Sequence, residues 1–425
     1  MNRKCAMLAV ALLSGAAVLT AFETPQEAIN AASNAMKTKN YAEAHRCLDE
    51  GFKLAVNPTE RVLVLTRRGE LYRTQNDWKN AEKMLMMIVN DKKMTPVQQA
   101  SAWLGIARYK ELQKKYEDVV DAYQSGIELN KEGNQAQEAL NKCGLLLIRL
   151  KDYTGAIECF NQVFSIPNKD ARRSNLLKQN ASTNIANTYV AMKQYDKAVK
   201  TLDDAAKQPY FKGKKEQKTL RKNILGIYET QIREAIRFKK FADAEKALAE
   251  LKKRDNSKGP VSMEVAIFCG KAAVAARKRD YASAESFYRA ALNVKGAEAN
   301  DLRNVYSDLI NYYIRFKKFA DAEKALKQMM TLPCNTVEDQ FLSNDCRRRY
   351  LCAVNKFDEA IKLMEETAKL KGLRPARVAR CYGLICQIYY SNKKDVDMAK
   401  KYYDMATKVP GGNWQSAYLR KKLGF

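Results

Sequence analysis

The sequence predicts an all-α fold, an α-solenoid of about ten stacked helix-turn-helix units that form a superhelix with a concave groove. The first observation is a stretch of thirteen residues, IRFKKFADAEKAL, that occurs at 236–248 and again, unchanged, at 314–326. The second is a looser form of it, a polar or basic pair, an aromatic residue, two variable residues and Ala, which recurs along the chain. The third is composition, with 46% hydrophobic residues and only 9 Pro. Together they indicate an array of helical hairpins.

The aromatic position of this pattern defines the length of each unit. It is held in chain order by Tyr41, Trp78, Tyr116, Tyr153, Tyr195, Phe241, Tyr281, Phe319, Phe357 and, without an aromatic ring, Val396. Successive positions lie 37 to 46 residues apart. Apolar residues recur at intervals of three and four around them, as at Ile224, Tyr228 and Ile232, which is typical of amphipathic helices. Each unit is therefore two helices, which must stack on neighbouring units to bury their apolar faces.

The residues beside each turn suit the ends of two helices. Basic residues before the aromatic position are expected to complement the negative end of the first helix dipole, at Lys39, Lys115, Lys240 and Lys318. Acidic residues after it suit the positive start of the second helix, at Glu43, Asp118, Asp243 and Asp321. The Ala three positions after the aromatic residue lets the two helices approach closely.

This pattern resembles the tetratricopeptide repeat family, in which Gly or Ala in the first helix precedes an aromatic-x-x-Ala turn. The second, fourth and fifth units match it through Gly69, Tyr72, Trp78 and Ala81, through Gly144, Tyr153, Ala156 and Phe160, and through Ala186, Tyr189, Tyr195 and Ala198. The resemblance runs from about residue 24 to 410 and leaves a short C-terminal cap at 411–425. Because the family's unit is about 34 residues long, longer helices or loops are expected here.

The first residues differ from the rest of the chain. Asn2, Arg3 and Lys4 precede an apolar run, Cys5 to Ala21, that ends in small residues. This predicts a cleavable signal peptide at 1–21, with a retained N-terminal anchor as the alternative. Residues 22–425 are then expected to form the solenoid, without a transmembrane segment, in the periplasm or outside a bacterial cell.

Nine cysteines follow the signal, and this odd number does not suggest a disulfide framework. Most of them lie at apolar helical positions, where Cys behaves as a small hydrophobic residue. Cys143 and Cys159 lie on the two helices of the fourth hairpin at similar distances from its turn, so the hairpin allows a disulfide there and leaves open whether it forms. The single histidine, His45, lies two residues from Cys47 and so on another helix face, which speaks against a metal site.

The sequence also predicts that the protein is not an enzyme and holds no cofactor. A chain with one histidine lacks the usual source of catalytic bases and metal ligands. Motifs of the types G-x-S-x-G, Walker A and G-x-G-x-x-G are not found. The carboxylates recur at helix starts and on exposed helix faces, as solvated helix charges do.

The charge balance, 75 Lys and Arg against 48 Asp and Glu, gives a net charge of +27 and favours anionic partners. The longest interval between aromatic positions contains the stretch KQPYFKGKKEQKTLRK, in which a helix is expected to start near Lys214. We call its cations the basic loop: Lys207, Lys212, Lys214, Lys215, Lys218, Arg221 and Lys222. Two interpretations stay open, a solvated loop or an element that contacts anions.

The family register implies a second set of candidate residues, because the positions that resemble groove-lining sites hold Arg more often than Lys. These are Arg108, Arg149, Asn187, Arg233, Arg237, Arg277, Asn311, Arg315 and Arg349. Arg offers a planar fork that suits carboxylate or phosphate groups. The resemblance therefore implies a non-enzymatic scaffold that binds an acidic protein or peptide along a basic groove. The alternative is electrostatic binding of an anionic polymer, such as an acidic polysaccharide, a phosphorylated envelope polymer or nucleic acid.

Overall fold

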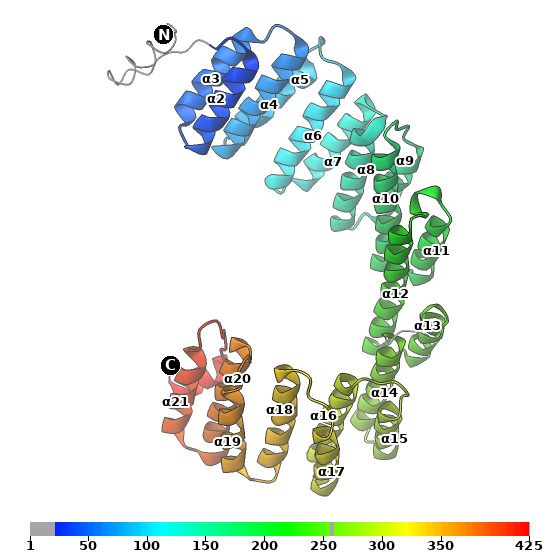
Figure 1. The fold of residues 1–425 in the computed structure, drawn as a ribbon, viewed down its shortest axis with the longest axis vertical. Helices are drawn as coiled ribbons and strands as arrows, with labels where there is room; N and C mark the ends of the chain where they lie inside the picture. Colours follow the sequence, from blue (N-terminus) through cyan, green and yellow to red (C-terminus); the bar gives the residue numbers. More distant parts are fainter. Residues whose placement is uncertain (1–21, 256–258, 425) are drawn as a thin grey trace, which may run out of the picture. The chain divides into compact units, whose positions relative to one another are not determined.

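The computed structural model describes residues 22–255 and 259–424, whose regular elements are all helices. The predicted signal peptide, 1–21, lies outside the described residues. The chain divides into two compact units, Met1–Ile224 and Leu225–Phe425, and the division falls inside α12 (Lys214–Arg237). Figure 1 shows the helices in chain order, and one continuous superhelix from 22 to 425 stays a prediction.

The described residues of unit 1 form five helical hairpins, each a first helix followed by a second helix. They are α2 (Pro25–Lys37) with α3 (Tyr41–Leu54), α4 (Pro58–Thr74) with α5 (Trp78–Asn90), α6 (Pro96–Leu112) with α7 (Tyr116–Leu129), α8 (Gly133–Arg149) with α9 (Tyr153–Ser165), and α10 (Ala171–Ala191) with α11 (Tyr195–Ala206). A short helix, η1 (Pro209–Phe211), precedes α12.

Unit 2 continues the same alternation after the end of α12. Its helices are α13 (Phe241–Arg254), α14 (Gly259–Arg277), α15 (Tyr281–Leu292), α16 (Ala299–Arg315), α17 (Phe319–Met330), α18 (Val337–Ala353), α19 (Phe357–Ala368), α20 (Pro375–Ile388), η2 (Tyr389–Lys393) and α21 (Val396–Thr407). A last short helix, α22 (Ala417–Leu423), packs on α21 and contributes the buried side chains of Leu419 and Leu423.

The predicted aromatic position begins the second helix of each of the ten hairpins, from Tyr41 to Val396, which confirms the helical repeat. Two residues earlier the backbone adopts a left-handed conformation, with φ between 56° and 65°, at Lys39, Asn76, Lys114, Lys151, Lys193, Lys239, Arg279, Lys317, Asn355 and Lys394. The next backbone N–H reaches back to the first helix, as in the 2.8 Å bond from Lys318 N to the Tyr313 carbonyl. This is the hydrogen bond that ends a helix in a Schellman motif.

The structure corrects the role expected for three of the turn lysines. Lys115, Lys240 and Lys318 are the N-cap residues of the second helices, not the last residues of the first ones, and none of them makes a side-chain cap bond. In other hairpins the same position is Asp, and Asp280, for example, accepts a hydrogen bond from Ser283 N at 3.1 Å. The turn lysines therefore face the positive end of a helix dipole, which is unfavourable.

Close packing of the two helices depends on the small residue after each turn. The Ala or Val at this position is fully buried in each of the ten hairpins, as are Ala81 and Ala322. Gly144 has a related role, because a Cβ there would lie 2.6 Å from Cε1 of Phe160. The two longest intervals between turns are explained by long first helices, 21 residues in α10 and 24 in α12.

One helix of unit 2, α14, is long and apolar enough to cross a membrane by length and composition alone. In the structure it packs against α13, α15 and α16, and it buries Met263, Val265 and Ile267. These contacts are those of a core helix in the stack.

Candidate functional site

The predicted groove residues all lie on first helices, four or eight residues before the aromatic position. We call the solvent side of these helices the first-helix face. Unit 1 carries Arg108, Arg149 and Asn187, and unit 2 carries Arg237, Arg277, Asn311, Arg315 and Arg349, together with Arg233. Within unit 2, the labelled ribbon places α14, α16, α18 and α20 on one side of the stack and their partner helices on the other (Figure 1).

In unit 1 the predicted cations alternate with apolar residues. Arg149 donates a 2.8 Å hydrogen bond to the Tyr116 hydroxyl, and its guanidinium lies 4.6 Å from the centre of that ring. Leu112 holds on α6 the position that Arg149 holds on α8, Leu145 holds on α8 the position that Arg108 holds on α6, and the two leucines are 53% and 46% exposed. The face of unit 1 is therefore mixed apolar and basic, which the search for cations alone missed.

In unit 2 three arginines repeat at one position of consecutive first helices. We call Arg237, Arg277 and Arg315 the arginine row; each is the last residue of its helix, and all three are exposed. No carboxylate of the described residues lies within 4 Å of their side-chain nitrogens. Arg233 differs, because Glu229 lies 3.9 Å away on the same helix. The guanidinium groups of the row thus lack a carboxylate partner, while those of Arg237 and Arg315 lie 5.8 and 6.0 Å from the centres of the Phe238 and Phe316 rings.

Two other predicted residues bind each other. Nη1 of Arg349 on α18 donates to Oδ1 of Asn311 on α16, and Nη2 donates to the Ser307 hydroxyl at 2.9 Å. The same guanidinium approaches Asp345 at 3.8 Å. Arg349 and Asn311 thus connect neighbouring first helices, and their donors are largely used within the protein.

One acid lies on the same part of unit 2. Burial raises the pKa of Asp308, and the positive charge of Arg349 opposes that shift. Burial raises the pKa values of Cys269 and Tyr288, and the nearby Asp308 carboxylate raises both further. Asp308 is still accessible to water, and its carboxylate lies near Arg349.

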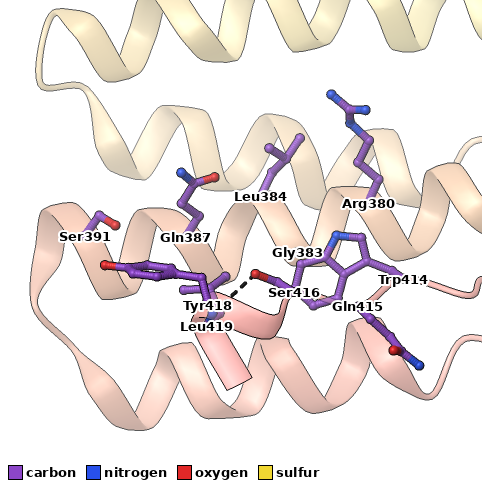
Figure 2. Close-up of a pocket in the computed structure, with 10 residues that line it drawn as sticks. All are labelled: Arg380, Gly383, Leu384, Gln387, Ser391, Trp414, Gln415, Ser416, Tyr418 and Leu419. Atoms are coloured by element: carbon purple, nitrogen blue, oxygen red, sulfur yellow. Dashed lines mark hydrogen bonds between the residues drawn. The ribbon is translucent and has the colours of Figure 1, made fainter. Parts of the chain in front are cut away.

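A hollow of about 380 Å³ lies at the C-terminal end of unit 2. Figure 2 shows Arg380, Leu384 and Gln387 projecting from one side of α20, with the rings of Trp414 and Tyr418 beside them. Gln387 follows Arg349 by 38 residues, the interval that also separates Arg349 from Asn311, so it continues the first-helix face. The hollow combines one cation, amide groups and two aromatic walls.

Trp414 is fixed in place by close packing. A Cβ on Gly383 would lie 2.3 Å from Cε2 of the indole, and the indole meets the Tyr403 ring edge-on at 5.5 Å. The sequence predicts only a cap at 411–425 and does not indicate this hollow. The signal in the sequence that could have indicated the hollow is Trp414, a tryptophan close to the end of the predicted solenoid.

The basic loop is mostly helical. As predicted, α12 starts at Lys214, so that five of the seven cations lie on its first turns. Lys207 pairs with Asp204 at 2.8 Å. The aromatic residues between the cations point inward, because Phe211 is 3% exposed and Tyr210 packs on Phe164. The stretch therefore offers charge without aromatic rings on which bases would stack.

Residues 22–255 and 259–424 contain no group of three or more His, Cys, Asp and Glu side chains placed to hold a metal ion. His45 instead lies 3.1 Å from the Gln75 side-chain oxygen.

The architecture and the first-helix face define a class of protein, the helical-hairpin repeat scaffold. A model of the tetratricopeptide repeat family matches residues 135–170 and 180–208, which cover the fourth hairpin and much of the fifth. These two segments are similar to tetratricopeptide repeats, and such repeats generally mediate protein–protein interactions. A model of the family described as anaphase-promoting complex subunit 5 also matches, at residues 1–57.

Several solved structures are similar to this chain at low identity. A tetratricopeptide repeat protein from Parabacteroides merdae is 15% identical, with 66% of this chain and 96% of that one covered and a TM-score of 0.33. Yeast Tom70 is 12% identical, with 94% of both chains covered and a TM-score of 0.36. No significant match was found among curated proteins. Because these TM-scores are low, the fold assignment rests on the chain's own repeats.

Proposed function

We propose that this protein is a non-enzymatic scaffold that binds an acidic segment of a partner protein on the first-helix face of unit 2. The observation that carries the proposal is the arginine row, in which three consecutive first helices present an exposed guanidinium without a carboxylate partner. Charge-assisted bonds from such groups are worth about 1.5–3 kcal/mol each.

The spacing of the row suggests the form of the partner. Helices α14 and α16 pack on each other, and neighbouring packed helices lie about 8–10 Å apart, so Arg277 and Arg315 present cations at about that interval. An extended polyproline-type chain has three residues per turn and rises about 3.1 Å per residue, so every third side chain faces the same way about 9 Å apart. A segment with an acidic residue at every third position fits this interval.

Export to the periplasm or the outside of the cell is part of the proposal and is supported by the apolar run at 5–21.

The competing function, binding of an anionic polymer, is supported by the net charge and by the exposed lysines of the basic loop. Polymer binding should weaken steeply with salt, whereas a peptide that also inserts side chains beside Trp414 should be retained better.

The test uses a labelled peptide with Glu at every third position and measures fluorescence anisotropy against the full chain. Replacing Arg237, Arg277 and Arg315 by Glu should weaken binding more than about a hundredfold. Replacing Lys212, Lys214 and Lys215 by Glu makes the same change in net charge and should have little effect. The opposite result would assign binding to the basic loop, and equal losses from both variants would indicate attraction by net charge alone.

A second variant separates the charge of the row from its geometry. Each arginine also complements the dipole of the helix it ends, and Lys at these positions keeps that role. Replacing the three arginines by Lys should therefore preserve helicity and still weaken peptide binding, because Lys lacks the planar fork.

A further inference from the structure

The fourth hairpin brings two thiols together in one packed cluster. Cys143 on α8 is fully buried, and Cys159 on α9 is half-buried. Helices α8 and α9 pack on each other, Cys159 packs against the buried cluster that contains Cys143, and each thiol shifts the pKa of the other. The adjacent pair, Gly144 and Phe160, is packed so closely that a Cβ on the glycine would overlap the ring.

The helices approach closely enough at this level for a covalent bond. Packed helices are separated by about 8–10 Å between axes, and each has a Cα radius of about 2.3 Å, so facing Cα atoms lie about 4–5 Å apart. Disulfides join Cα atoms that are about 4.4–6.8 Å apart. Facing cysteines on these two helices can therefore be joined without unfolding the hairpin.

The two thiols differ in a way that suits disulfide exchange. The interaction with Cys143 lowers the pKa of the Cys159 thiol, while the same interaction, together with burial, raises the pKa of the Cys143 thiol. Cys159 is also the thiol that solvent reaches. It is thus the attacking group, and Cys143 is the buried group placed to complete the reaction.

We propose that Cys143 and Cys159 form a reversible disulfide that fixes α8 to α9, by exchange with a small disulfide such as oxidised glutathione. The Cys159 thiolate attacks one sulfur of the donor, and the other donor sulfur leaves and takes up a proton. Cys143 then loses its proton to solvent and attacks the sulfur of Cys159, which releases the second donor thiol. The protein loses two protons and two electrons, and the donor disulfide is reduced to two thiols.

The bond would act on the part of unit 1 that carries the mixed apolar and basic surface. Leu145 and Arg149 lie on α8 within two turns of Cys143. Because the disulfide closes the loop of residues 143–159, it restrains the unfolded hairpin and slows opening of these two helices. Oxidation thus stabilises one segment of the first-helix face.

The experiment incubates the full chain in glutathione buffers of increasing oxidised fraction, blocks the remaining thiols with iodoacetamide and maps the peptides by mass spectrometry. The wild type should lose two free thiols and yield one peptide pair joined through Cys143 and Cys159. Cys47→Ala, a control at a buried cysteine of α3, should behave in the same way. Cys143→Ala should stop at a glutathione adduct on Cys159, and Cys159→Ala should leave Cys143 unreacted.

Oxidised wild type should also be cleaved more slowly by protease within 143–159 than reduced wild type. The proposal is overturned if the wild type keeps all its free thiols in fully oxidised buffer, or if the joined peptides contain other cysteines. Circular dichroism of each variant checks that a lost reaction is not a lost fold.

Discussion

Replacing Arg303 by Met should destabilise α16 and α18 more than removal of any surface ion pair in unit 2. Arg303 is 1% exposed and lies on α16. Its guanidinium donates to the Ser343 hydroxyl at 3.1 Å and to the Pro333 carbonyl at 2.8 Å, and it lies 3.4 Å from Oδ1 of Asp339. The side chain thus connects α16 to the loop before α18 and to the first turns of α18.

The expected magnitude follows from what the substitution leaves behind. Met fills much of the same volume, but the Asp339 carboxylate stays buried without its cation. Breaking a buried ion pair by removing one partner costs about 3–5 kcal/mol. Asp339→Asn in the same chain removes the uncompensated charge and keeps an acceptor for the N–H groups of Asn335 and Thr336, so the double variant should recover much of the loss.

The assay is native-state hydrogen exchange of the α16 and α18 amides, because a repeat array need not unfold in one step. Arg289→Met is the control, since its ion pair with Glu285 is a surface contact between residues four apart and is worth about 0.3–0.5 kcal/mol. If Arg303→Met changes exchange no more than this control, or if the double variant is worse than the single one, the argument from the buried charge is wrong.

Three further predictions concern the turns, the packing and the acid of unit 2. Lys240→Asp should stabilise α13 by about 1 kcal/mol, because it supplies the missing N-cap acceptor, and hydrogen exchange of the first α13 amides should slow. Ala322→Leu should cost about 1–3 kcal/mol by forcing α16 and α17 apart, and urea unfolding of unit 2 should begin at lower concentration. The Asp308→Asn variant should be more stable than wild type at neutral pH. The raised pKa of the Asp308 carboxyl means that folding disfavours its charged form, and Asn carries no charge. The difference in unfolding free energy between the variant and wild type should vanish below about pH 3.9, the pKa of an unfolded Asp. If urea titrations at lower pH still show the variant to be more stable, the pKa of Asp308 is not the cause.

The repeat itself was predictable because its determinants are local. Tyr41, Trp78 and the other aromatic positions lie within a few residues of both helix ends, so that each turn is encoded by a short, repeated stretch. The start of α12 at Lys214 was predictable for the same reason. The assignment of Lys115 and Lys240 to the end of the first helix was wrong, because they lie three residues after its last residue; dipole arguments give the sign of a preferred charge and not the exact end of a helix.

Other features depend on contacts between distant residues and leave no pattern in the sequence. Arg303 looks like any helical arginine until α18 covers it, and Arg349 and Asn311 looked equivalent to the arginine row until the structure paired them. Trp414 becomes part of a hollow only because Gly383, far from it in the chain, lies beneath its indole. The register of the tetratricopeptide repeat pattern located the first-helix face. Only the packing showed which side chains on that face have no carboxylate partner.

The most direct test of the central claim is to map where an acidic segment binds. The labelled peptide with Glu at every third position would carry a photoactivatable cross-linker, and cross-linked residues of the full chain would be identified by mass spectrometry. Our account predicts cross-links on α14, α16 and the C-terminal half of α12, and their loss when Arg237, Arg277 and Arg315 are replaced by Glu. Cross-links concentrated between residues 207 and 222, or unchanged by the triple substitution, would contradict it.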